Sequence, residues 1–177
     1  MQNIFLNYIL KSIMINKLNW FLFFGLIYSI NLVSQSNQTN KLQIYPCGTY
    51  KLISKTTYKN GNKIGKHGTI QVKPISSDKI IMSFYVNLGF PTYNSGSFID
   101  TLTIESNNAT YKIPEYDSSC QIKFKFSIST ISISETTEDY YMGCGFGNAV
   151  RTDGLQFKKT SSKIPKIKDF TTGEVFE

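Results

Sequence analysis

Apolar and polar residues alternate along most of the chain after residue 47, which is the pattern of β-strands that bury one face. The alternation is clean from Lys79 to Asn87 and again from Cys120 to Phe126. Turn residues such as Asn60-Gly61 interrupt it at intervals of roughly 8–12 residues, and little of this region has a helical period. The pattern predicts strands over residues 48–58, 69–73, 79–87, 97–105, 109–113 and 120–126, around Ile131 and Ile133, and over about 154–159.

These predicted strands follow one another in an up-and-down order, so neighbours in sequence are expected to pair antiparallel. About eight antiparallel strands can close into a barrel, which removes the unpaired edges of an open sheet. The sequence therefore predicts an all-β domain of about eight antiparallel strands, in the form of a small up-and-down β-barrel. A two-sheet β-sandwich is the alternative, because alternation does not reveal whether a sheet closes.

An apolar segment precedes the predicted strands. Lys17 introduces the run from Trp20 to Ile30, and small residues follow at Ser34 and Ser36. A basic residue, a short apolar run and a small-residue cleavage site are typical of a signal peptide. The run is shorter than the roughly 20 apolar residues that a membrane-spanning helix needs. We therefore predict an exported protein, periplasmic or secreted, that meets a membrane only through its uncleaved signal segment.

The same reasoning divides the chain into four parts. We expect a signal peptide over residues 1–34, with translation starting at Met1 or at Met14. A polar lead-in over 35–46, a β domain over 47–160 and a basic, flexible tail over 161–177 follow.

Composition changes this interpretation little. The chain has 177 residues, of which 41% are hydrophobic and 18% charged, which is compatible with one buried core. The net charge is +7, but the lysines are spread along the chain and do not form one block. A nucleic-acid partner is therefore not expected.

Three cysteines occur in a chain that we expect to be exported, where disulfides persist. Cys120 opens one predicted strand, and Cys144 follows the strand that pairs with it. Hairpin geometry favours a Cys120–Cys144 bond, and pairs that use Cys47 are the alternative. The remaining thiol is expected to be buried or available to another chain.

Few residues have the character of a catalytic site. The Gly143 to Gly147 segment is interpreted as a tight turn, because a phosphate-binding loop would require a helix after it. His67 is the only histidine, so any triad or His-based metal site would use it, and no acidic residue is close to it in sequence. We therefore predict no catalytic residue, no cofactor and no metal. A hydrolase that uses His67 is the rival hypothesis.

Acidic residues gather at Glu135, Glu138 and Asp139, in one predicted loop. Their oxygens could contribute to a Ca²⁺ site. The spacing matches no established calcium loop, so a solvated acidic loop is the preferred interpretation.

Aromatic residues in predicted loops are the candidate ligand-binding residues. Loops at one end of a barrel can line a binding mouth, although such residues can also cover the open end of the core. They predict a non-enzymatic exported binding or interaction module whose partner is a protein or a small apolar or glycan ligand. A loop of the same kind could plug an enzyme cleft, so an inhibitor of an exogenous hydrolase such as lysozyme is the alternative, with the 90–96 loop as the inhibitory element. The candidates are Phe90, Tyr93, Tyr116, Tyr140 and Tyr141.

Four segments of the chain resemble a group of small exported bacterial β-domain proteins of unknown function. These are Cys120-Gln-Ile-Lys-Phe-Lys-Phe, Cys144-Gly-Phe-Gly-Asn-Ala-Val, Asp153-Gly154 and the loop from Phe90 to Ser97. The likeness covers roughly residues 80–160 and implies export and a disulfide across the C-terminal hairpin, but no catalytic residues. One departure is Leu155-Gln156-Phe157, where the group typically has a small residue followed by tyrosine.

Overall fold

The structure of the protein is a computed structural model that describes residues 44–176. The predicted signal peptide, its two start positions and the lead-in up to residue 43 lie outside the described residues. Within residues 44–176, no helix has the length and apolar character that crossing a membrane requires.

Nearly all regular structure in the described part is β-strand, as the sequence predicts. A short 3-10 turn, η1, covers Gly143–Gly145. The strands are β1 (Gly48–Leu52), β2 (Thr57–Lys59), β3 (Asn62–Pro74), β4 (Lys79–Gly89), β5 (Ser95–Glu105), β6 (Asn108–Ile113), β7 (Asp117–Phe126), β8 (Thr130–Thr136), β9 (Gln156–Ser161), β10 (Ile167–Lys168) and β11 (Val175–Phe176).

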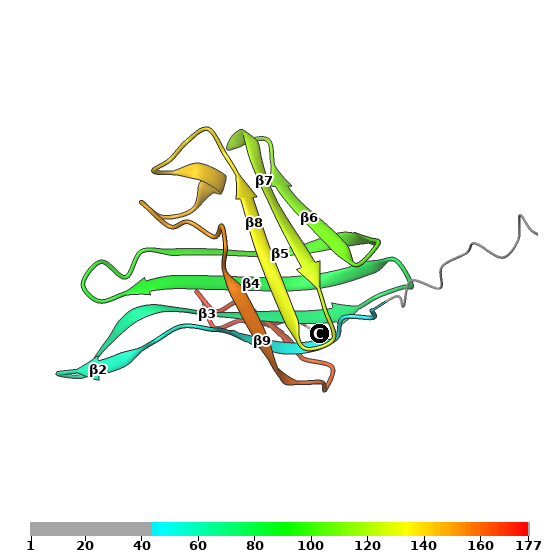
Figure 1. The fold of residues 1–177 in the computed structure, drawn as a ribbon, viewed down its shortest axis with the longest axis horizontal. Coiled ribbons are helices and arrows are strands. Elements are labelled where there is room, and N and C mark those ends of the chain that lie inside the picture. Colours follow the sequence, from blue (N-terminus) through cyan, green and yellow to red (C-terminus); the bar gives the residue numbers. More distant parts are fainter. Residues whose placement is uncertain (1–43, 177) are drawn as a thin grey trace, which may run out of the picture. The chain divides into compact units, whose positions relative to one another are not determined.

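Eight of these strands close into an antiparallel barrel, which confirms the predicted barrel over the sandwich. Each strand from β3 to β9 pairs with the next, and β1 closes the ring by pairing with both β9 and β3. Tyr50 of β1 lies opposite Ile70 on one side and opposite Lys159 on the other. Figure 1 shows β3 and β4 running along the molecule while β7 and β8 cross them steeply.

The strand boundaries differ most from the prediction at the beginning of the domain. Sequence alternation predicts one strand over 48–58 and another from 69, but β1 ends at Leu52 and β3 starts at Asn62. The extra strand β2 pairs with the first residues of β3 through the turn at Asn60 and Gly61, both of which have positive φ. This hairpin extends beyond the ring of eight strands.

The barrel is least tightly joined between β5 and β6. Only Ile104 with Ala109 and Glu105 with Asn108 are paired, next to the two-residue turn between the strands. Beyond them, the rings of Phe98 and Tyr111 stack with centroids 3.8 Å apart. This aromatic contact joins the two strands where their backbones are no longer paired.

The barrel interior is filled by side chains from the inward-facing positions of the strands. Phe84 is 1% exposed and lies at the centre of an aromatic group, with ring centroids 5.3–6.1 Å away. These side chains come from several strands, so their close packing holds the strands of the barrel together around one core. The rings that surround Phe84 are Phe98, Phe124, Phe146 and Phe157.

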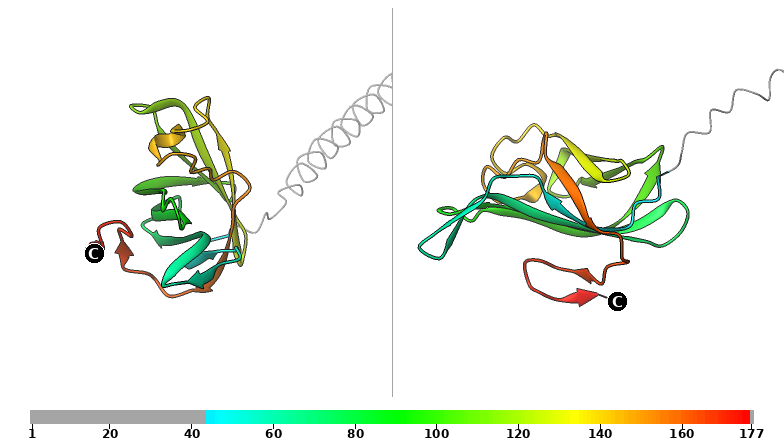
Figure 2. Two further views of the ribbon diagram at one scale, coloured as in Figure 1. Left: turned by 90° about the vertical axis from the view of Figure 1, so that its left-hand side faces the viewer. Right: turned by 60° about the horizontal axis from the view of Figure 1, so that its bottom comes forward.

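In place of the expected flexible tail, β10 and β11 form a short hairpin that lies outside the barrel (Figure 2, red). Ile167 is 1% exposed, and the hydroxyl of Ser83 on β4 donates to the carbonyl of Lys168 at 2.6 Å. The backbone N–H of Lys168 donates to Oε1 of Gln71 on β3 at 2.8 Å. Polar residues on the outer faces of β3 and β4 thus hold a segment whose own sequence has no strong alternation.

Candidate functional site

The predicted aromatic residues share one end of the barrel, here called the loop end. It carries the β4–β5, β6–β7 and β8–β9 connections, because alternate connections of an up-and-down barrel lie at the same end. All five side chains are well exposed, with 44–78% of their surface accessible. Phe90 and Tyr93 belong to the first connection, Tyr116 to the second, and Tyr140 and Tyr141 to the third.

The core at this end is closed by a different aromatic residue. Phe146 follows η1, is 4% exposed and packs against Phe84 at a ring separation of 5.9 Å. Gly96 makes room for it, since a Cβ there would lie 2.5 Å from Cγ of Phe146. The core is therefore covered without the five exposed rings. Sequence reasoning missed Phe146, although its position between Gly145 and Gly147 marks a place where the backbone folds closely.

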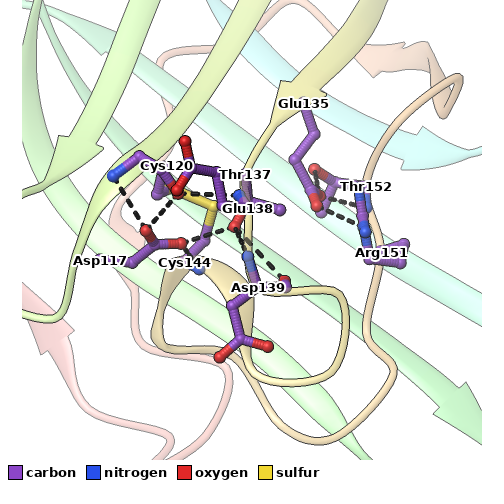
Figure 3. The surroundings of a disulfide bond; sticks show 10 residues. Asp117, Cys120, Glu135, Thr137, Glu138, Asp139, Cys144, Arg151 and Thr152 are labelled. Atoms are coloured by element: carbon purple, nitrogen blue, oxygen red, sulfur yellow. Dashed lines mark hydrogen bonds and ion pairs between the residues drawn. A yellow bond between two sulfur atoms is a disulfide. The ribbon is translucent and has the colours of Figure 1, made fainter.

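A disulfide bond joins Cys120 of β7 to Cys144 of η1, as predicted (Figure 3). Their Cα atoms are 5.1 Å apart. β8 ends at Thr136, opposite Gln121, and the chain then loops back so that Cys144 reaches Cys120. Cys144 takes a φ of 61°, and Gly145 after it has a φ of 66°. The Gly143 to Gly147 segment is thus a tight turn that brings the cysteine back to the sheet.

Asp117 fastens this loop to the barrel by a network of hydrogen bonds (Figure 3). Its Oδ1 accepts from the backbone N–H and the hydroxyl of Ser119. Its Oδ2 accepts from the hydroxyl of Thr137 at 2.6 Å and from the backbone N–H of Cys144 at 3.2 Å. These bonds, first that from the Ser119 hydroxyl and then that from Thr137, hold the pKa of Asp117 well below its usual value.

Asp117 also lies beside the two bonded sulfur atoms, with one possible ligand atom of each residue within 4.8 Å of the others. Metal ions bind the thiolate form of cysteine. Both sulfur atoms are engaged in the disulfide, so the role of this cluster is to attach η1 to β7.

Glu135 holds the other side of the same connection (Figure 3). Its side chain is 1% exposed, and its carboxylate pairs with Arg151 Nε. The second oxygen accepts from the backbone N–H and the hydroxyl of Thr152, both at 2.6 Å. Arg151 in turn lies over the ring of Tyr140, with Cζ 5.3 Å from the centroid. A buried acid thus positions one of the exposed aromatic residues.

The other two acids of the predicted cluster do not join Glu135 in an oxygen-lined site within the described residues. Oδ1 of Asp139 accepts from the backbone N–H groups of Tyr141 and Met142, each at 2.9 Å. It therefore shapes the backbone that carries the two tyrosines. Glu138 lies in the same loop and is exposed.

The loop that carries Phe90 and Tyr93 is stabilised by hydrogen bonds to the end of β4 and to the start of β3. The side chain of Asn87 donates to the carbonyl of Tyr93 and accepts from the N–H of Gly89, both at 2.7 Å. The hydroxyl of Tyr93 donates to Oδ1 of Asn62 at 2.6 Å. The rings of Phe90 and Tyr93 meet edge to face at 6.1 Å, and the Phe90–Pro91 peptide bond is cis.

Two further contacts join this loop to the β8–β9 connection. The side chain of Asn94 donates to the carbonyl of Asn148 at 2.8 Å. The N–H of Gly147 donates to the carbonyl of Ser95 at 2.9 Å. Hydrogen bonds therefore join the loop that carries Phe90 to the loop that carries Tyr140.

His67, the residue that a hydrolase would need, lies on β3 in a pocket on the outer wall of the barrel. Its Nδ1 donates to the carbonyl of Gly65 at 3.2 Å. Burial, together with the nearby charges of Lys63 and Lys51, lowers the pKa of His67, although the hydrogen bond to Gly65 opposes the shift. The described residues that line the pocket include no carboxylate that could orient the imidazole.

The third cysteine, Cys47, is free and half-buried. Its sulfur lies 3.8 Å from the carbonyl oxygen of Ser162. It is therefore neither fully buried nor part of an intramolecular disulfide.

The likeness to exported bacterial β-domain proteins stays a prediction that rests on the motifs named above. No protein-family model, no curated protein and no solved structure shows a significant match to this chain.

Proposed function

We propose that the protein is a non-enzymatic exported binding module that holds its partner at the loop end of the barrel. The observation that carries this proposal is the group of exposed aromatic residues on three connections at one end. The core does not need them as a cover, since Phe146 already closes it. Exposed aromatic residues gathered on one surface are typical of a recognition site.

The loop end is also well suited to binding because it is held in place before a partner arrives. The Cys120–Cys144 bond, Asp117 and Glu135 fix the β8–β9 connection, and Asn87 fixes the β4–β5 connection. Loops that are ordered in advance lose less conformational entropy on binding. Tyrosine supplies a large contact area with few rotatable bonds.

The filled interior favours a partner that lies across the loop end rather than inside the barrel. Phe84, Phe124 and Phe157 each have 1% or less of their surface exposed. A protein surface or a glycan can stack on the exposed rings without entering the core. We therefore favour these two partner classes over a small apolar molecule enclosed by the barrel.

Export is proposed on two grounds. The first is the apolar segment after Lys17, which has the length of a signal peptide. The second is the Cys120–Cys144 disulfide, which is typical of oxidising compartments. The periplasm and the extracellular space both meet this condition.

The test is a pull-down and ligand screen with the purified protein, across glycans, lipids and envelope proteins. We expect a saturable partner that is lost when Tyr116, Tyr140 and Tyr141 are all changed to alanine. Tyr45→Ala is the matched control, because Tyr45 is a 55% exposed tyrosine whose hydroxyl reaches Ser76 at the opposite end. A screen that returns nothing, or a partner that the triple variant retains, would contradict the proposal.

Inhibition of a hydrolase is a second candidate function, and the conformation of the 90–96 loop favours it. Phe90 is the first residue of this loop and is 46% exposed, while hydrogen bonds to Lys63 and Asn87 hold the backbone around it. Such a loop could enter an enzyme cleft without a large entropic cost. Titration against lysozymes and proteases tests this idea. Undiminished enzyme activity at a molar excess, or equal inhibition by Phe90→Ala and the native protein, rejects it.

A further inference from the structure

A basic pocket of about 270 Å³ lies on the outer wall of the barrel, between β1, the start of β3 and the C-terminal segment. Residues 63, 67 and 69 are separated by even numbers of positions along β3 and so belong to the same outer face. Lys51 of β1 is paired with Thr69, which is paired in turn with Tyr85 of β4. The pocket is lined by Lys51, Leu52, Ser54, Thr56, Lys63, His67, Gly68, Thr69, Tyr85 and Phe170.

Three basic groups therefore meet in one place, and no acid among the described lining residues balances them. Within residues 44–176, neither Lys51 nor Lys63 forms an ion pair with a carboxylate. The ammonium group of Lys51 donates to the hydroxyl of Thr69 at 2.8 Å. Burial, and after it the charge of Lys63, lowers the pKa of Lys51. The folded protein thus carries an uncompensated repulsion at this pocket.

We infer that this pocket, formed by Lys51, Lys63 and His67, binds an oxyanion group of the phosphate type. An anion between the two lysines would replace repulsion by charge-assisted hydrogen bonds. Ser54 and Thr56 also line the pocket, and a hydroxyl group can donate a further hydrogen bond to an oxyanion. The rings of Tyr85 and Phe170, 5.9 Å apart, form an apolar wall for the carbon part of a larger ligand.

His67 links anion binding to the uptake of a proton. Its Nδ1 donates to Gly65, so Nε2 is the ring nitrogen that accepts the second proton. The groups that face it in the pocket are Lys51 of β1, Lys63 of β3, Tyr85 of β4 and Phe170 of the C-terminal segment. A bound oxyanion stabilises the protonated ring and should raise the pKa of His67.

This binding site goes beyond the proposed function of the loop end and does not depend on it. The two regions use different side chains. They are neighbours through the backbone, because the carbonyl of Lys63 accepts from the N–H of Phe90 at 2.8 Å. The triple tyrosine variant should therefore bind oxyanions like the native protein, which separates failure of one proposal from failure of the other.

The experiment follows the imidazole signal of the purified protein by NMR, which is unambiguous because the chain has one histidine. Inorganic phosphate is titrated against chloride at equal ionic strength. We expect a saturable shift with phosphate and a rise in the pKa of His67. The double change Lys51→Gln and Lys63→Gln should weaken phosphate binding by roughly ten-fold or more. Lys125→Gln, an exposed lysine on β7, should leave it unchanged.

A second arm distinguishes a soluble phosphate compound from a lipid head group. It measures sedimentation of the protein with vesicles of phosphatidylglycerol and of phosphatidylcholine. Binding of free phosphate supports a soluble ligand. Binding only to phosphatidylglycerol vesicles, lost in the lysine double variant, supports a head group. If neither probe binds, or if a folded double variant or a folded Lys63→Glu variant binds like the native protein, the inference is overturned.

Discussion

The carboxylate of Asp117 accepts a hydrogen bond from the backbone N–H of Cys144 at 3.2 Å. This bond joins the first residue of β7 to a cysteine of the disulfide. The same carboxylate accepts from Ser119 and Thr137. The position of Cys144 therefore depends on the charged form of Asp117 and on one covalent bond.

Asp117 should make the stability of the domain depend on pH in the acid range. The pKa of Asp117 is lowered in the folded state, so its contribution to stability is complete above the unfolded value of about 3.9. The contribution is lost as the pH falls below that value toward the folded pKa. We expect the thermal midpoint of the native protein to fall more steeply below about pH 4 than that of Asp117→Asn. Asp100→Asn, at an exposed aspartate on β5, should keep the native slope.

Removal of the disulfide should destabilise the folded state. The bonded cysteines are 24 residues apart, and closing a loop of that size stabilises by about 3 kcal/mol, mainly through the unfolded chain. Urea unfolding of a Cys120→Ala, Cys144→Ala variant measures the loss, with Cys47→Ala as the control. Peptide mapping under oxidising conditions that finds Cys120 unpaired would show that the bond is assigned wrongly.

Phe146 and Phe90 should differ in how much stability the domain loses on substitution by alanine. Phe146→Ala removes a ring that is 4% exposed and opens a cavity beside Phe84, so we expect a loss of about 3–5 kcal/mol. Phe90→Ala truncates a 46% exposed ring and should change the free energy of unfolding by about 1 kcal/mol or less. Equal losses in chemical denaturation would mean that Phe90, too, belongs to the core.

Glu135→Gln should loosen the β8–β9 connection without unfolding the barrel. The amide keeps an acceptor for Thr152 but loses the charge that pairs with Arg151. We expect a loss of about 1–3 kcal/mol and faster hydrogen exchange at residues 137–152. Glu138→Gln, at an exposed acid in the same connection, is the control. Native exchange rates in Glu135→Gln would show that the ion pair does not order this loop.

The sequence by itself determines most of the strands of the barrel and favours the disulfide. Alternation from Lys79 to Asn87 is a local property, and the structure buries Ile80, Met82, Phe84 and Val86 as the pattern predicts. Hairpin geometry favours the Cys120–Cys144 pair over the pairs that use Cys47, and the structure contains this bond. The placement of the five aromatic residues on loops was predictable as well, because turn residues flank them.

Only the tertiary structure decides the contacts between residues that are distant in sequence, which the alternation of apolar and polar residues does not predict. Barrel closure depends on β1 meeting both β3 and β9, which are distant in sequence. The parts played by Asp117, Glu135 and Phe146 depend on how an irregular connection folds back, because no periodicity restrains such a segment. The basic pocket forms for the same reason: the register that places Lys51 opposite Thr69 brings it to the face of β3 that carries Lys63 and His67. Strand register is set by the packing of the whole barrel, so these neighbours appear only in the folded chain.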